Sequence, residues 1–166
     1  QKLAGALKVL VTITLVCNLV ALLLVPGMSL MKGPEELLAL TPYENPLEVP
    51  LRVGIAFVLS WGWVWTAGVY EVVLALFLLF CGICTAVILW QGRRVLGTIL
   101  TGAPFRAENG VSLRRAAVCC FLIAAAALAR VVWGLFYYGS VAPLLTYNAL
   151  FVPIFILGGL LCLVMS

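Results

Sequence analysis

Residues 90–115 read WQGRRVLGTILTGAPFRAENGVSLRR and form a short hydrophilic island between two long apolar runs. The island holds five of the chain's ten Lys and Arg residues, although 65% of the 166 residues are hydrophobic. Basic residues gather in the cytoplasmic loops of helical membrane proteins. The island therefore predicts a cytoplasmic loop between two membrane-spanning helices, and it sets the orientation expected for the rest of the chain.

The composition of the whole chain indicates the same class of protein. Mean hydropathy is +1.22, and charged residues make up 10% of the sequence, whereas soluble globular domains carry roughly a quarter. Apolar stretches of about 18 residues or more can cross a hydrocarbon core roughly 30 Å thick, and several occur here. We therefore predict an all-α polytopic membrane protein, a bundle of four transmembrane helices, and we exclude a soluble globular domain.

Four apolar runs have the length expected of membrane spans. They cover about 3–25, 68–90, 113–137 and 144–165. Pro26 and Gly27 are expected to end the first span, because proline removes a helical hydrogen bond. The last two spans are joined by a short uncharged turn, so they are expected to be antiparallel neighbours. Residues 1–166 are thus read as a single membrane domain.

The segment 26–66, between the first two spans, is predicted to lie outside the cytoplasm. It carries four of the chain's six acidic residues and two of its basic ones. Its last part, residues 51–66, is expected outside or at the membrane interface, as a strand or a shallow helix. Three tryptophans in that part favour the interface, where tryptophan is enriched.

The distribution of charge predicts the orientation. Seven basic residues fall on the side of the island: Lys2, Lys8, Arg93, Arg94, Arg106, Arg114 and Arg115. The positive-inside rule then places both termini and the island in the cytoplasm. This topology explains the net charge of +4, so we predict no direct binding of nucleic acid.

Residues 91–112 are predicted to form a cytoplasmic helical hairpin. Apolar residues at helical spacing continue the second span past Arg94, which indicates that the helix leaves the membrane intact. Gly102 suits the left-handed residue that closes a helix, and Pro104 prevents the helix from resuming. Phe105 is expected to fold back as a hydrophobic plug.

The sequence GAPFRAENGVSLRR, residues 102–115, is similar to a signature of a known family. Small bacterial four-span membrane proteins of the domain of unknown function 2975 family carry Gly-x-Pro-Phe-Ser/Thr-x-Glu-Asn, followed by a Leu-Arg pair. The matching residues here are Gly102, Pro104, Phe105, Glu108, Asn109, Leu113 and Arg114.

The chain departs from this signature at Arg106, where the family has Ser or Thr. The spacing places Glu108 and Asn109 in the first turn of the next helix, where such side chains satisfy free amides. Arg106 removes the hydroxyl of a capping box with Glu108. We therefore expect the helix to start late, at Asn109 or Ser112.

The resemblance carries implications for fold and function. In the family the signature lies between the second and third spans, which agrees with the layout above. The family's genes often lie beside a gene for a small helix-turn-helix protein, so the resemblance implies a bacterial inner-membrane component of a sensing or regulatory pair. The family also has a cytoplasmic C-terminal extension, so we expect the natural protein to continue beyond Ser166.

We therefore expect a non-enzymatic protein that contacts the lipid bilayer and a cytoplasmic regulatory protein. The candidate partner contacts are Arg93, Arg94, Arg106 and Arg115. A small transporter or channel subunit is the first alternative. The sequence contains no histidine, Walker loop or dinucleotide fingerprint, so no catalytic residue, cofactor or metal is predicted.

Two charged residues are predicted inside the spans. Glu71 and Arg130 lie in the outer halves of the second and third spans, where a lone charge costs several kcal/mol. We expect the two to meet as an intramembrane charge pair that clamps the helices. A ligand or ion site at the same residues is the alternative.

Six cysteines lie within the predicted spans. Cys81 and Cys84 form a Cys-x-x-Cys motif, which thiol–disulfide oxidoreductases use, and this activity is the second alternative function. The two thiols share one helix face, and cysteine is also a common small residue in helix packing. Redox chemistry and simple packing both fit the motif.

Polar and small residues are expected to hold the helices together. Asn18, Thr12 and Thr14 in the first span can hydrogen-bond to neighbouring helices. Gly158 and Gly159 in the last span favour close packing. An exposed face of small residues can also bind a second copy of the chain, so a homo-oligomer is a further candidate assembly.

Overall fold

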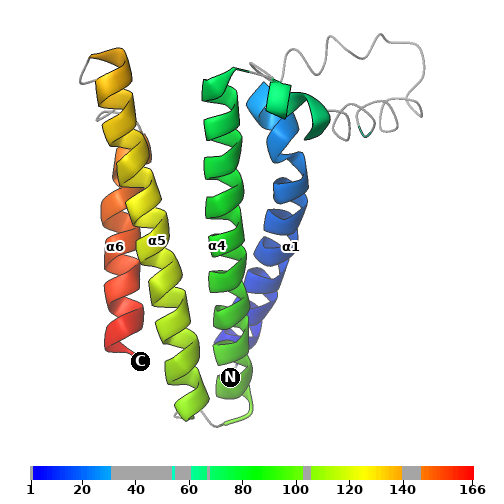
Figure 1. Ribbon diagram of the computed structural model, residues 1–166. Coiled ribbons are helices and arrows are strands. Elements are labelled where there is room, and N and C mark those ends of the chain that lie inside the picture. Colours follow the sequence, from blue (N-terminus) through cyan, green and yellow to red (C-terminus); the bar gives the residue numbers. More distant parts are fainter. Residues whose placement is uncertain (1, 31–53, 55–60, 67, 103–105, 140–146) are drawn as a thin grey trace. The chain divides into compact units, whose positions relative to one another are not determined.

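The computed structural model describes residues 2–30, 54, 61–66, 68–102, 106–139 and 147–166. In chain order its elements are α1 (Lys2–Leu30), the 3-10 turn η1 (Val64–Thr66), α4 (Val69–Leu100), α5 (Ala107–Tyr138) and α6 (Tyr147–Val164) (Figure 1). All of these elements are helical, so the predicted all-α class is confirmed. The chain forms two compact units, one of Gln1–Leu19 with Phe80–Ser166 and one of Val20–Leu79.

Three of the described helices are long and apolar enough to cross a membrane. The qualifying stretches are Leu3–Val25, Val69–Leu100 and Ala107–Tyr137, and they coincide with or extend the first three predicted spans. The helix α6 lies where the fourth span is predicted, but its apolar stretch, Ala149–Val164, is shorter. The structure therefore supports a helical membrane protein, and the count of four spans stays a prediction.

The helix α1 continues through Pro26 and Gly27 to Leu30, so the predicted end of the first span at that pair is wrong. Proline has a helical φ and costs the helix mainly one hydrogen bond. Membrane helices tolerate this loss when other donors satisfy nearby backbone carbonyls. The carbonyl that Pro26 leaves without its helical donor is that of Leu22. The adjacent Leu23 carbonyl accepts a hydrogen bond from the Trp61 indole Nε1–H at 3.1 Å.

The unit Val20–Leu79 has a small apolar core around η1. Val64 is buried and clusters with Val25 of α1 and Ala75 of α4, while the neighbouring Trp61, Trp63 and Trp65 stay exposed. Of the segment 26–66, residues 26–30, 54 and 61–66 are described, and they are helical. The helical alternative therefore holds for the described part of 51–66.

The helix α5 begins at Ala107, so the predicted late start at Asn109 or Ser112 is wrong. Arg106 is the N-cap, in an extended conformation with φ −84° and ψ 139°, and its side chain makes no capping hydrogen bond. The Asn109 backbone N–H donates to the Arg106 carbonyl at 2.9 Å. The first turn thus closes through the backbone, and a capping hydroxyl is not required.

Polar residues of α1 take two different partners. Asn18 Nδ2 donates to the Gly82 carbonyl of α4 at 2.9 Å, which confirms the predicted hydrogen bond between helices. The hydroxyls of Thr12 and Thr14 instead donate to carbonyls four residues earlier in α1. A threonine on a helix reaches its own backbone more easily than a neighbouring helix, because its side chain is short.

The helices α5 and α6 lie side by side (Figure 1). Gly139 ends α5 in the left-handed conformation, with φ 59°. Gly159 of α6 faces Phe121 of α5 so closely that a Cβ there would lie 3.0 Å from the Phe121 ring. Gly159 is therefore used for packing within the chain, as predicted, and is covered rather than open to a second copy.

The start of α1 and the end of α6 both lie close to the helix ends that flank the α4–α5 turn. The Lys8 Nζ of α1 lies 3.6 Å from the position of a Cβ at Gly97, near the end of α4. The Ser166 carbonyl oxygen lies 2.7 Å from the position of a Cβ at Gly110, in the first turns of α5. The start of α1 and the end of α6 therefore lie at the same end as the hairpin.

Candidate functional site

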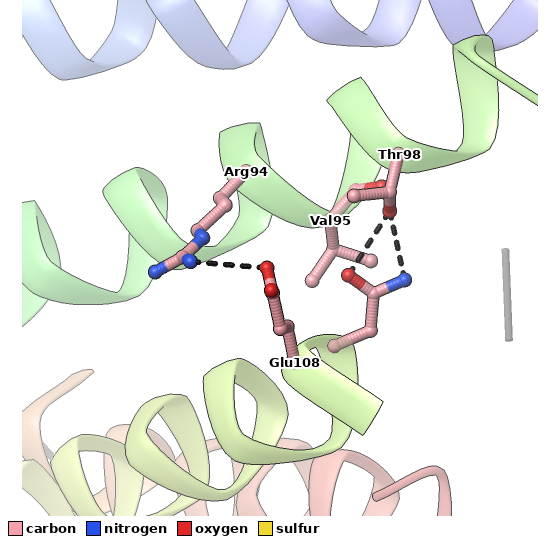
Figure 2. A network of polar contacts seen from close by, with 5 residues as sticks. Arg94, Val95, Thr98 and Glu108 are labelled. Carbon is pink, nitrogen blue, oxygen red and sulfur yellow. Dashed lines mark hydrogen bonds and ion pairs between the residues drawn. The ribbon is translucent and has the colours of Figure 1, made fainter. Parts of the chain in front are cut away.

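The hydrophilic island forms the end of α4 and the start of α5, and side chains tie these two arms together (Figure 2). Arg94 Nη2 of α4 lies 3.3 Å from Glu108 Oε2 of α5 in an ion pair. Their side chains are 52% and 65% exposed, so solvent screens the attraction. Exposed pairs of this kind contribute about 0–1 kcal/mol to folding stability. This ion pair therefore orients α4 and α5 more than it stabilises them.

A second, more buried contact lies one turn further along α4. Asn109 Nδ2 donates to Thr98 Oγ1 at 2.7 Å, and Thr98 Oγ1 lies 2.7 Å from the Val95 carbonyl (Figure 2). The single Thr98 hydroxyl proton has two acceptors within reach, the Val95 carbonyl and Asn109 Oδ1, which lies 3.0 Å away. The contact therefore links Asn109 through Thr98 to the α4 backbone, and Asn109 is 5% exposed.

The first five signature residues, from Gly102 to Asn109, divide into three groups. Gly102 has φ +76°, which confirms the left-handed residue predicted to close the helix. Glu108 and Asn109 lie in the first turn of α5, also as predicted, but their side chains contact α4. Pro104 and Phe105, with the predicted hydrophobic plug, lie outside the described residues.

The arginines of the hairpin differ in their contacts with other side chains. Arg94 pairs with Glu108, and the Arg93 guanidinium lies 5.9 Å from the centroid of the Trp90 ring, within cation–π range. The remaining arginines, Arg106, Arg114 and Arg115, are exposed. The island has five arginines and one acidic residue, so the hairpin presents a strongly positive surface.

Three polar side chains are buried in the described part of the chain, and all belong to the hairpin helices. They are Gln91, Asn109 and Ser112. Gln91 is 8% exposed, and among the described residues its Oε1 has no hydrogen-bond partner. Nothing in the sequence indicates this buried carboxamide, because Gln91 lies at the edge of a charged stretch.

The cysteines gather across three helices. Cys81 and Cys84 lie on α4, Cys119 and Cys120 on α5, and Cys162 on α6; Cys84 and Cys120 are buried. All these thiols are free. Within the described ranges, no three histidine, cysteine or acidic side chains group so that they could hold a metal ion.

The predicted charge pair of Glu71 and Arg130 falls in two different compact units and stays a prediction. Glu71 lies in the first turn of α4, where the helix dipole favours a carboxylate. Its Oε2 is 2.5 Å from the position of a Cβ at Gly68, so the side chain folds back toward the start of its own helix. This local arrangement was not expected from the sequence.

Comparison with known proteins adds no relative. No family model, curated protein or solved structure matches the chain. The resemblance to the domain of unknown function 2975 family therefore stays a prediction.

Proposed function

We propose that this chain is a non-enzymatic protein of the bacterial inner membrane, and that its α4–α5 hairpin binds a cytoplasmic partner protein in a sensing or regulatory role. The observation that carries the proposal is the division of roles among the arginines. Arg94 is paired with Glu108 in an interhelical contact, whereas Arg106, Arg114 and Arg115 are exposed beside it. A braced hairpin that displays exposed positive charge is suited to recognise a partner.

The proposed topology has four spans, with both termini and the hairpin in the cytoplasm. Lys8 approaches Gly97 and Ser166 approaches Gly110, which supports one common side for these three parts. The helix α6 has 18 residues, and at 1.5 Å per residue it measures about 27 Å. That length is close to a hydrocarbon core of roughly 30 Å, so α6 is proposed to be the fourth span.

The chemistry of the hairpin defines the partner as an acidic protein surface. Arginine forms bidentate hydrogen bonds with carboxylates, and clustered positive charge accelerates encounter with an acidic partner. A small helix-turn-helix regulator, which the family resemblance suggests, is proposed as this partner. Its acidic face, rather than its DNA-binding face, would meet the hairpin.

Co-purification from membranes tests the proposal. The variant Arg114→Glu/Arg115→Glu should lose the bound protein, whereas the matched control Arg114→Lys/Arg115→Lys should keep most of it, because the control preserves charge. Binding should weaken as salt rises, since ions screen exposed charges beyond roughly 10 Å at 0.1 M. Equal recovery from the charge-reversed and the control variants would contradict the proposal.

Two further measurements separate the proposal from its alternatives. Reporter tags near residues 40 and 103 should lie in opposite compartments if the hairpin is cytoplasmic. Solute flux in proteoliposomes that depends on Glu71 or Arg130 would instead favour a transporter or channel subunit.

A further inference from the structure

Two half-buried basic side chains lie where α4 leads into the hairpin, and they come from different helices. The Lys8 Nζ of α1 lies 3.6 Å from the position of a Cβ at Gly97 of α4, and Arg93 precedes Gly97 by four residues. Residues four apart share one face of a helix. Lys8 and Arg93 therefore place positive charge on the same side of α4.

The described part of the chain supplies no carboxylate to either cation. Its two acidic residues are Glu71 and Glu108. Glu108 pairs with Arg94, and Glu71 lies in the first turn of α4, at the other end of that helix from Arg93. A half-buried charge has lost part of its hydration, so a nearby anion lowers its free energy. Lys8 and Arg93 can therefore accept an anion from outside the chain.

Trp90 indicates the depth at which these cations meet the membrane. The Arg93 guanidinium lies over the Trp90 ring, 5.9 Å from its centroid, and Trp90 is 58% exposed. Both residues belong to Val69–Leu100, which is long and apolar enough to cross a membrane. Exposed tryptophan is enriched at the level of the lipid headgroups, and a guanidinium over an aromatic face keeps its N–H donors free for an anion.

An exposed apolar stripe of α4 leads up to the same cations. Phe80, Ile83, Val87 and Trp90 are all exposed, and they follow one another at spacings of three and four residues, so they share one helix face. Arg93 is the next residue at this spacing. The stripe therefore offers an apolar surface to an acyl chain and ends at a positive charge.

We propose that Lys8, Arg93 and Trp90 form a binding site for the headgroup of an anionic phospholipid, whose acyl chains lie along this stripe. The guanidinium donates N–H groups to phosphate oxygens, and the ammonium adds a second positive charge. Basic clusters between transmembrane helices bind such headgroups. The site uses none of the three exposed arginines that carry the proposed function, so it stands or falls separately from that function.

Native mass spectrometry of the protein in detergent micelles tests the proposal, with dioleoyl phosphatidylglycerol as the probe. The wild-type chain should bind this lipid roughly tenfold more tightly than phosphatidylcholine with the same acyl chains, whose headgroup has no net charge. Lys8→Gln/Arg93→Gln should weaken phosphatidylglycerol binding by roughly tenfold or more. The matched control Arg114→Gln/Arg115→Gln removes the same amount of charge elsewhere on the hairpin and should bind the lipid as the wild type does.

Thermal unfolding in detergent shows whether each variant folds, and Arg93→Gln compared with Arg114→Gln gives the same test if the double variant does not. Unchanged binding in the Lys8/Arg93 variant, or an equal loss in the control, would overturn the site. Equal binding of the two lipids would reject selection for an anionic headgroup. Displacement of phosphatidylglycerol by inorganic phosphate alone would show that the site takes a soluble phosphate, which would overturn the lipid as its ligand.

Discussion

Asn109 of α5 donates a hydrogen bond to Thr98 of α4 at 2.7 Å, across a separation of eleven residues that includes the turn. The bond continues through the Thr98 hydroxyl to the Val95 carbonyl, so a side chain from one helix is linked to the backbone of the other. It is the buried member of the two contacts that brace the hairpin.

Replacing Asn109 should destabilise the hairpin more than any change at its exposed ion pair. Asn109→Ala removes a buried donor, and such losses cost about 1–3 kcal/mol. Thermal unfolding in detergent should show this loss, and it should not depend on salt. A double-mutant cycle with Thr98→Val should show that the two effects are not additive, and simple additivity would contradict the direct bond.

The ion pair of Arg94 and Glu108 should behave in the opposite way. Glu108→Gln should cost at most about 1 kcal/mol, because both side chains are exposed and screened. The small effect should vanish as salt is raised, which unfolding at two ionic strengths can measure. A salt-independent loss as large as that of Asn109→Ala would show that Glu108 has a buried role.

Gly110 should be intolerant of even one methyl group. A Cβ there would lie 2.7 Å from the Ser166 carbonyl oxygen, and overpacking of this kind typically costs 1–3 kcal/mol. Gly92→Ala is the matched control, since Gly92 is also helical and a Cβ there meets nothing within 4 Å. The control should be neutral or stabilising by up to about 1 kcal/mol, and equal effects at both sites would contradict the close approach.

Gln91 offers a change that should increase stability. Its Oε1 is buried without a hydrogen-bond partner in the part of the chain that the structure describes, and an unsatisfied buried acceptor costs roughly 1–3 kcal/mol. Gln91→Met keeps the shape and removes the oxygen, so its midpoint of thermal unfolding should rise. A fall instead would mean that a water molecule or another donor serves this oxygen in the membrane.

Gly102 should require glycine for its backbone conformation rather than for space. Its φ is +76°, and a Cβ there would meet nothing within 4 Å. Gly102→Ala should cost about 1–2 kcal/mol, the usual penalty for an L-residue in the left-handed region. Gly102→Asn should cost less, since asparagine tolerates this region better, and the same unfolding experiment ranks the two variants.

Part of the fold was predictable because it rests on local rules. Composition and the length of the apolar runs indicate membrane helices whatever their neighbours are, and three qualifying helices lie where they were expected. Gly102 was predicted as the left-handed end of α4 because glycine adopts that conformation without a steric penalty. The same local rules failed at Pro26, through which α1 continues, and at Arg106, where the backbone closes the first turn of α5 without a capping side chain.

The pairing of side chains between helices was not predictable in the same way. Glu108 and Asn109 were expected to act within the first turn of α5. The structure instead directs both side chains toward α4. Which side chains meet depends on the register of two helices that are joined by a turn, and single-residue propensities carry no information about that register.

By itself, the sequence determined an all-helical protein with membrane-spanning character and a basic loop between two of its helices. Hydrophobic burial and the positive-inside rule act on each segment separately, so a linear pattern is enough to read them. Only the tertiary structure decided that Asn109 hydrogen-bonds to Thr98 and that Ser166 lies against Gly110. Those contacts depend on helix packing over distances of a few ångströms, which the order of residues along one chain does not specify.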